Sequence, residues 1–327
     1  MKDFDLKLPE NLDAAIGELP AEYTREGAQV LAGGQDLVTV MKDDIEQPAA
    51  LVSLQRLGLD GIQWDGDGGV TLGATVTVQT LADDADLERA FPALREAARS
   101  IGSPQIRSQA TLGGNLNQRP RCPYYRHPSV SCFKKGGSVC LAEFGFNKYA
   151  AIFGGGPSYF SHPSDLATVL LMLGATASVS GPDGERQVPL AELYVLPEES
   201  LETETVLRPD EILTSVTIPA PPAETRSSYL KFKERASYDF ALAAVAVSVV
   251  LDGSGVVTDA RVVLGGVAPK PWEVPAAARA LTGKSMGPEA WTAAGAAAVA
   301  DADPLEHNGY KVHLVKGLVF RALESLA

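Results

Sequence analysis

Apolar residues follow two different spacings along the chain, which predicts a mixed fold of helices and strands. Short apolar runs typical of buried strands lie at residues 29–32, 51–54 and 70–76. Between the first two runs, apolar residues at helical spacing occupy 36–41, and an earlier helix is predicted to open at Asn11. The N-terminal part is therefore predicted to be a compact strand–helix–strand unit.

The middle of the chain contains one long stretch without periodicity. Before it, apolar residues recur at helical spacing over 87–101. After it, we predict a helix at 166–171 and strands at 176–180 and 212–218. Residues 117–161 are instead dominated by prolines, glycines, aromatics and cysteines. A loop of that length inside a compact domain is uncommon unless it carries function or a cofactor.

The proline-rich segment 219–222 predicts a linker between two domains. Beyond it we predict strands at 229–232, 243–251 and 256–264, with Asp252-Gly253-Ser254-Gly255 as the hairpin turn between the last two. Three alanine-rich helices are predicted to complete the chain, at 274–281, 288–300 and 312–326.

The composition narrows the class of protein. With 327 residues, 45% hydrophobic and 21% charged, the chain can bury a sizeable core and is neither disordered nor a coiled coil. Its net charge of −13 argues against non-specific nucleic-acid binding. Neither a membrane-spanning apolar run nor a signal-peptide core is present, so we expect a cytoplasmic protein without membrane contact. Export to the periplasm while bound to a signal-bearing partner would leave the same sequence.

Two glycine pairs, Gly33-Gly34 and Gly113-Gly114, each follow an apolar run that resembles a strand. Glycines at a strand-to-helix turn let backbone N–H groups approach a pyrophosphate closely, because no side chain blocks the contact. Neither pair belongs to the G-x-G-x-x-G pattern of nicotinamide-binding folds. Taken alone, each pair is also compatible with a simple tight turn.

The residues around the glycine pairs are more specific. Leu31-Ala32-Gly33-Gly34-Gln35-Asp36-Leu37 and Ala110-Thr111-Leu112-Gly113-Gly114-Asn115-Leu116 resemble the two FAD-binding signatures of the medium subunits of the molybdenum hydroxylase (xanthine dehydrogenase) family. The resemblance continues, in order, through the segments 162–166, 213–219, 231–239 and 264–269. It spans nearly the whole chain.

The resemblance implies an α+β fold. Residues 1–220 would form a two-lobed FAD-binding domain of the PCMH/vanillyl-alcohol-oxidase type, and 225–327 a smaller domain of antiparallel sheet and helices. The FAD would be held by the two signatures, that is by Leu31, Ala32, Gly33, Gly34, Gln35, Asp36, Leu37, Thr111, Gly113, Gly114 and Asn115.

Two further residues match the family pattern. Asp165 corresponds to an acidic residue that turns towards the ribityl or ribose hydroxyls, and Lys231 to a lysine that offers countercharge to phosphate or reduced flavin. From local chemistry alone, Asp165 could equally be a helix N-cap and Lys231 a solvated strand residue.

All three cysteines, Cys122, Cys132 and Cys140, lie in the aperiodic stretch, which argues against a disulfide framework. Soft thiolates favour iron–sulfur or zinc, and the spacing lacks the C-x2-C pairs of structural zinc sites. Residues 107–148 also carry seven basic side chains and one acidic one, so we expect an anionic group within this segment or docked against it. Three buried thiols without metal are the alternative.

The insertion at about 117–161 resembles the branch of the family whose flavoprotein subunit holds an additional [4Fe–4S] cluster, as in the periplasmic aldehyde oxidoreductase and 4-hydroxybenzoyl-CoA reductase type. That branch uses four cysteines, and the fourth position falls near Ser158. His127, His162, Ser158 or an aspartate could complete the cluster. A three-iron or labile cluster, or loss of the metal, remain alternatives.

No Ser-His-Asp, paired-carboxylate or H-E-x-x-H pattern is present, so we expect no catalytic residue acting on the organic substrate. The resemblance implies an electron-transfer subunit that passes electrons from [2Fe–2S] clusters through FAD to an external acceptor. Its partners would be a large molybdopterin-cofactor subunit and a small subunit with two [2Fe–2S] clusters. A structural or assembly subunit with degenerate cofactor sites, and a stand-alone flavin oxidase, are the alternative functions.

Overall fold

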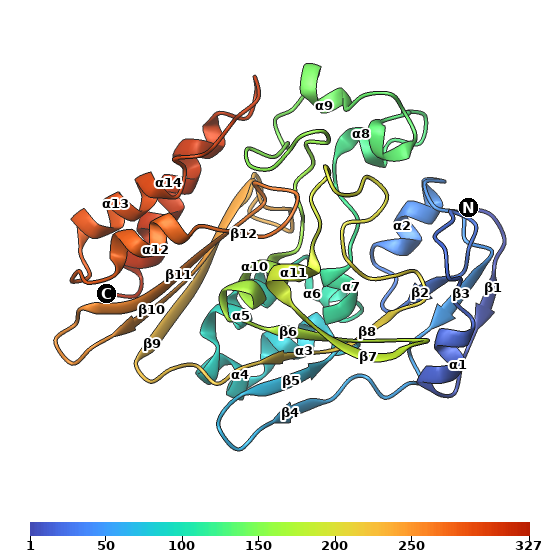
Figure 1. Cartoon of the computed structure of the whole chain (residues 1–327), viewed down its shortest axis with the longest axis horizontal. Helices are drawn as coiled ribbons and strands as arrows, with labels where there is room; N and C mark the ends of the chain where they lie inside the picture. The colour runs from blue at the N-terminus through green and yellow to red at the C-terminus, as the bar shows by residue number, and fades with distance from the viewer.

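The computed structural model describes all residues, 1–327, and contains three separate sheets (Figure 1). The N-terminal lobe has a parallel sheet in the order β1-β3-β2 with two short helices. Its elements are β1 (Asp5–Lys7), α1 (Leu12–Gly17), β2 (Gln29–Leu31), α2 (Leu37–Lys42) and β3 (Ala50–Ser53). The predicted start at Asn11 is confirmed, because its side chain caps α1 by accepting the N–H of Ala14 at 2.8 Å.

The second lobe is built on a five-stranded antiparallel sheet in the order β4-β5-β8-β6-β7. Its strands are β4 (Ile62–Trp64), β5 (Val70–Gly73), β6 (Thr176–Gly181), β7 (Gly184–Pro189) and β8 (Ile212–Ile218). Its helices are α3 (Val78–Asp83), α4 (Ala85–Ala90), α5 (Pro92–Ser100), α6 (Pro104–Arg107), α7 (Leu112–Leu116), α10 (Asp165–Met172) and α11 (Leu190–Leu193). The largest hydrophobic core lies between this sheet and these helices.

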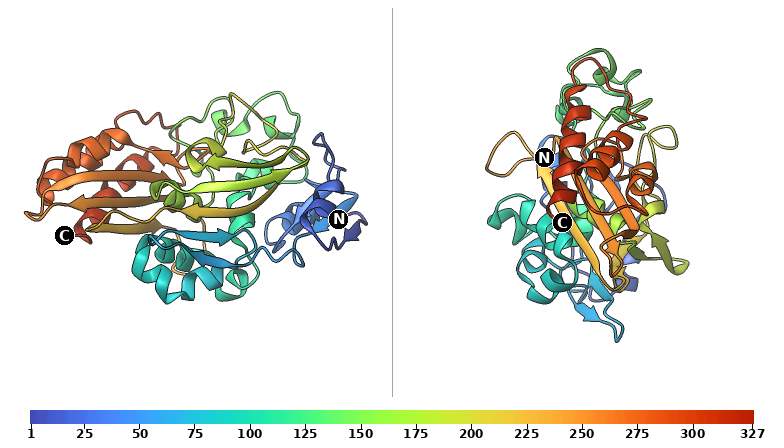
Figure 2. Two further views of the ribbon diagram at one scale, coloured as in Figure 1. Left: turned by 60° about the horizontal axis from the view of Figure 1, so that its bottom comes forward. Right: turned by 90° about the vertical axis from the view of Figure 1, so that its left-hand side faces the viewer.

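The C-terminal domain is a four-stranded antiparallel sheet in the order β12-β11-β10-β9, packed between two groups of helices (Figure 2). Its elements are β9 (Thr225–Phe232), β10 (Ala243–Leu251), β11 (Val257–Gly265), β12 (Trp272–Glu273), α12 (Pro275–Leu281), α13 (Pro288–Ala297) and α14 (Tyr310–Glu324). Along β10, Val245 and Val247 join the core beneath α12–α14, whereas Ala244 and Ala246 join the core of the second lobe. Both faces are buried, which explains the continuous apolar run.

The insertion lies at one end of the molecule, at the top of Figure 1, and contains only α8 (Pro123–Arg126), a 3-10 turn (Phe133–Lys135) and α9 (Leu141–Phe144). Its last part is held by the C-terminal domain. The buried ammonium of Lys311 donates to the carbonyls of Tyr149, Ala150 and Gly266 at 3.1, 3.0 and 2.8 Å. Burial lowers the pKa of Lys311 to about 7. No helix of the chain is long and apolar enough to cross a bilayer.

Two sequence expectations are wrong. The helix expected over 87–101 is two helices, because Phe91 leaves helical geometry and Pro92 starts α5. The second glycine pair follows no strand: Gly113 and Gly114 lie inside the short helix α7.

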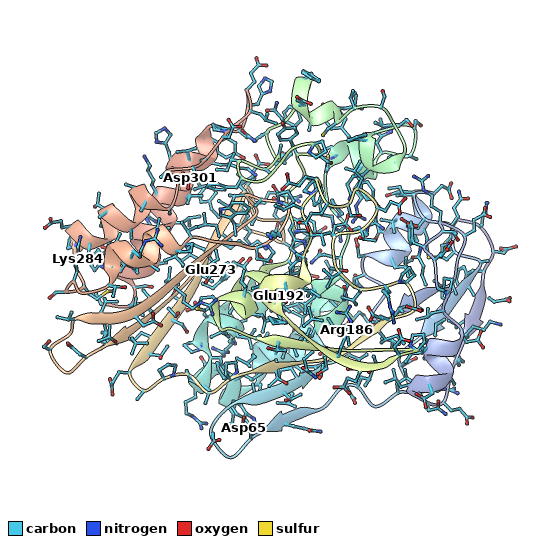
Figure 3. The ribbon with its side chains drawn as sticks, in the orientation of Figure 1. Asp65, Arg186, Glu192, Glu273, Lys284 and Asp301 are labelled. Carbon is cyan, nitrogen blue, oxygen red and sulfur yellow. The ribbon has the colours of Figure 1, made fainter.

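The pattern also missed both edge strands of the five-stranded sheet. On β7 only Val188 is buried, so the strand shows no clear alternation, and Arg186 (labelled in Figure 3) pairs with the buried Glu211. The β4–β5 turn is closed by Asp65, also labelled in Figure 3, which accepts the N–H groups of Asp67 and Gly69.

Candidate functional site

A cavity of about 780 Å³ lies between the two lobes, and both glycine pairs line it. The lobes meet at Gly33, where a Cβ atom would lie only 1.8 Å from the carbonyl oxygen of Gln109. Gly34 adopts a φ of +69°, a conformation that L side chains rarely take. The first signature therefore requires glycine at both positions, one for close approach and one for the turn.

The backbone N–H groups of Gly33, Gly34, Gln35 and Asp36 have no acceptor within the protein. Unpaired backbone donors are uncommon in a folded chain unless they face solvent or a ligand. A run of successive N–H groups at a turn forms a concave site that favours an anion. This row borders the large cavity, so the first signature is arranged to receive an anionic group.

The second signature also lines the cavity, and its N–H groups, except that of Thr111, are paired within the protein. Thr111 caps α7 by accepting the N–H of Gly114 at 3.2 Å, and the N–H of Gly113 donates to the carbonyl of Ala74 at 2.8 Å. Asn115 accepts a hydrogen bond from the hydroxyl of Ser164 at 2.7 Å. This segment shapes the wall, whereas the first signature offers the free donors.

Asp165 and Lys231 form a buried ion pair of 2.7 Å that joins the second lobe to the C-terminal domain. Tyr229, two residues before Lys231 on β9, donates its hydroxyl to the other carboxylate oxygen of Asp165. Ser164, not Asp165, is the N-cap of α10. Both predicted residues line the large cavity, so a ligand there would meet them as a hydrogen-bonded pair.

A second cavity, of about 330 Å³, lies between the insertion and the C-terminal domain. It adjoins the first, because five residues line both: Arg121, Pro163, Asp165, Asp239 and Phe240. The two cavities together form an elongated site that could hold a ligand with chemically different ends.

Asp36 ties the first signature to the insertion. Its Oδ1 forms ion pairs with Arg121 and Arg126, each at 2.8 Å, and its Oδ2 accepts the N–H of Arg119 at 2.7 Å. The Asp36 carboxylate therefore faces the insertion rather than capping α2. Burial lowers the pKa of Arg121, and the neighbouring Arg126 guanidinium adds to that effect.

Carboxylates from outside the basic segment compensate much of its charge. Arg119 pairs with Glu46 and Glu204 at 3.3 and 2.9 Å, and Lys134 pairs with Glu204 at 2.8 Å. Part of the negative charge expected beside the basic segment is thus supplied by carboxylates of the same chain. The acidic residues lie about 70 to 90 positions away, which is why sequence inspection did not pair them.

All three cysteines are free thiols; Cys132 and Cys140 are buried and Cys122 is partly buried. Burial raises the pKa of Cys122, and the nearby Cys140 and Cys132 raise it further. Cys132 and Cys140 are therefore near Cys122, although no three His, Cys, Asp or Glu side chains meet as they would around a single metal ion. The backbone N–H of Tyr159 donates to the sulfur of Cys140 at 3.5 Å, which brings Ser158 beside that cysteine.

His162 is buried against Tyr194, with ring centroids 4.5 Å apart, and neither ring nitrogen has a hydrogen-bond partner. Burial alone lowers the pKa of His162 to about 3. His127 is exposed, and its Nδ1 accepts the N–H of Ser129 at 3.2 Å. Neither histidine forms a hydrogen bond with a cysteine.

The structure brings nearly all of the predicted FAD-binding residues to the large cavity; Leu31 lies behind the wall, on β2. Sequence reasoning missed Arg121, Asp239 and Phe240, which border both cavities. The cluster of basic residues around Arg121 was the available signal, but it did not indicate which side chain faces a ligand.

Comparison with known families defines the class of protein. The family described as the FAD binding domain in molybdopterin dehydrogenase matches residues 2–221. The family described as the CO dehydrogenase flavoprotein C-terminal domain matches residues 227–326. The chain is an FAD-binding subunit of an oxidoreductase.

Comparison with individual relatives leads to the same class of protein. The chain is 39% identical to the aldehyde oxidoreductase FAD-binding subunit PaoB of Escherichia coli (strain K12), over 89% of this chain and 88% of the relative. It is 29% identical to the carbon monoxide dehydrogenase medium chain of Afipia carboxidovorans, over 86% and 81%. The solved carbon monoxide dehydrogenase of Hydrogenophaga pseudoflava superposes with a TM-score of 0.78 at 27% identity, covering 99% of this chain and 97% of that chain. The chain belongs to the FAD-binding medium subunits of the molybdenum hydroxylase family.

We expect Gly33→Ala to abolish FAD retention, because the new Cβ would collide with the backbone of Gln109 where the lobes meet. Flavin content after gel filtration measures the effect. Gly317→Ala on α14, where a Cβ meets nothing within 4 Å, is the matched control and should keep its FAD. Full flavin content in Gly33→Ala would show that the close approach is dispensable.

His162 should make the protein acid-sensitive. Its pKa is about 3 in the folded chain and about 6.5 in the unfolded chain, so between these two pH values the unfolded chain is protonated and the folded chain is not. Stability is therefore lost as pH falls from 6.5 towards 3, by about 2 kcal/mol between pH 7.5 and 5.0. Urea unfolding at both values measures this loss. We expect His162→Phe to reduce it and the exposed His313→Gln to leave it unchanged; equal losses in both variants would contradict the assignment.

Proposed function

We propose that this chain is the electron-transfer subunit of an aldehyde-oxidising molybdenum hydroxylase, placed between an iron–sulfur subunit and an external electron acceptor. The observation that carries the proposal is the row of unpaired N–H groups at Gly33–Asp36, facing a cavity large enough for a dinucleotide. The similarity to PaoB supports the aldehyde class of substrate. When bound, FAD supplies the redox chemistry.

The proposal assigns the residues of the cavity as follows. The N–H groups of Gly33 to Asp36 hold the diphosphate, and the segment from Thr111 to Asn115 forms the neighbouring part of the cavity wall. Asp165 offers an acceptor to the sugar hydroxyls, and Lys231 holds Asp165 in place while supplying positive charge. We place the boundary between the two domains at residues 220–225, since β8 ends at Ile218 and β9 begins at Thr225.

We further propose that the partners are a large molybdenum-cofactor subunit and a small subunit with [2Fe–2S] clusters. The free N–H groups favour this over a purely structural or assembly role, because a subunit that binds no cofactor has no use for unpaired backbone donors. A stand-alone flavin oxidase would need a substrate pocket with a catalytic base. The carboxylates that line the two cavities are all ion-paired. The one histidine there, His162, is packed against Tyr194, and burial holds its pKa at about 3, well below that of an effective general base.

The three cysteines are proposed to hold a [4Fe–4S] cluster. Thiolates bind such a cluster one per iron, at separate corners, so they need not converge on one point as they do around a single ion. Three cysteines in a basic loop, two of them near Cys122, suit this requirement. Ser158, buried beside Cys140, is the best-placed residue for the fourth position.

The electron-transfer role is tested on the complex purified with its partner subunits. We expect about one FAD per chain, and anaerobic addition of an aldehyde should bleach the flavin absorbance. Removal of FAD should stop reduction of an external dye while the iron–sulfur signals still respond to aldehyde. A flavin that stays oxidised in an active complex would contradict the proposed position of this chain in the electron path.

The cluster is tested by iron and acid-labile sulfide analysis of the full chain with EPR after reduction. We expect about four irons per chain, lost in Cys140→Ser, and Ser158→Cys should slow the loss of iron in air because a thiolate replaces the weaker ligand. Absence of iron and sulfide from both the unaltered chain and Ser158→Cys would overturn this part of the proposal.

A further inference from the structure

Three cations line the large cavity: Arg119, Arg121 and Lys231. Two of them are neutralised within the protein. Lys231 pairs with Asp165 at 2.7 Å, and Arg119 lies between Glu46 and Glu204 at 3.3 and 2.9 Å. Neither Lys231 nor Arg119 could neutralise a ligand's negative charge without giving up its contact with a buried carboxylate.

Arg121 is different because it shares its carboxylate. The same Oδ1 atom of Asp36 forms ion pairs with both Arg121 and Arg126 at 2.8 Å, and its Oδ2 already accepts the backbone N–H of Arg119. Two guanidinium groups therefore face a single negative charge, and one positive charge is left uncompensated. The Nε atom of Arg121 is buried without a hydrogen-bond partner, as is one guanidinium nitrogen of Arg119 and of Arg126.

The two arginines have different surroundings. Arg126 lines neither cavity, and it donates to the carbonyls of Pro120 and Arg119 at 2.6 and 2.8 Å, which fixes the fold of the insertion. Arg121 lines both cavities, and the ring of Phe240 lies 4.8 Å from its guanidinium carbon. The spare positive charge is thus held at the wall of the ligand cavity by Arg121.

We propose that Arg121 binds the diphosphate of FAD. The Asp36 N–H is one of the four free donors of the first signature, and the Asp36 side chain contacts Arg121, so guanidinium and free N–H groups border the same part of the cavity. A diphosphate carries two negative charges, and a guanidinium presents paired donors that match phosphate oxygens. This inference rests on the proposed placement of FAD.

The consequence is that the insertion takes part in flavin binding. Arg121 immediately precedes Cys122 and belongs to the insertion, whereas the glycine signature belongs to the N-terminal lobe. FAD affinity then depends on the insertion being docked through Asp36, and disorder in the cysteine segment would weaken the cofactor site.

The test compares FAD and riboflavin, which lacks the diphosphate, by fluorescence titration of the deflavinated full chain at low and high salt. We expect Arg121→Gln to weaken FAD binding at least about tenfold, because a charge-assisted contact is lost, and to leave riboflavin binding unchanged. The salt dependence of FAD affinity should also decrease. Arg121→Lys should recover much of the loss, and Arg126→Gln, which removes the neighbouring charge from the same carboxylate, should weaken FAD binding less.

Three results would overturn the role of Arg121: unchanged FAD affinity in Arg121→Gln, equal losses for FAD and riboflavin, or equal losses in Arg121→Gln and Arg126→Gln. The last two would mean that the fold of the insertion matters rather than this side chain. Circular dichroism of each variant confirms that the chain is folded. Failure of the unaltered chain to bind FAD would instead overturn the proposed function itself, which separates the two conclusions.

Discussion

The close contact of two backbones at Gly33 is the constraint on which the site depends. The turn after β2 lies directly against Gln109, so no side chain fits between the two lobes at this point. The N–H groups of this turn have no protein acceptor, and its residues line the cavity. The same turn sets the start of α2 and therefore the position of Asp36. The geometry of the ligand site and the docking of the insertion thus have a common origin.

Electrostatics explains how an irregular segment of some 45 residues stays on the molecule. The insertion has little regular structure, but its cations meet carboxylates from three distant parts of the chain, at Asp36, Glu46 and Glu204. Burying charges is costly unless they are paired and hydrogen-bonded, so these contacts favour one arrangement more than they add stability. The packing of Cys132 and Tyr125 against Val40 of α2 supplies the apolar part of the interface.

Local pattern predicted the buried elements well and the exposed ones poorly. Strands such as β10, apolar on both faces, and the capped helix α1 were found because burial and capping leave a direct trace in the sequence. The edge strand β7 and the break between α4 and α5 at Pro92 show no clear periodicity in the sequence. The glycine signatures identified the cavity wall, yet the pairing of Asp165 with Lys231 and of Asp36 with three arginines depends on long-range geometry that no local pattern contains.

The buried pair of Asp165 and Lys231 shows why the two domains and the cavity form one unit. An ion pair with both side chains almost inaccessible gains little net stability, because desolvation offsets the attraction. Here it has a second effect: it fixes a carboxylate and an ammonium at the cavity edge, with Tyr229 holding the other carboxylate oxygen. The lysine and tyrosine come from β9 and the aspartate from α10, so neither domain alone can present this arrangement. Lys311 of α14 makes a similar contact between domains at the adjoining cavity. Its ammonium group donates hydrogen bonds to carbonyls of the insertion and of the loop at Gly266. Buried polar contacts between the domains therefore fix the walls of the cavity, in addition to the apolar core that the second lobe shares with the C-terminal sheet.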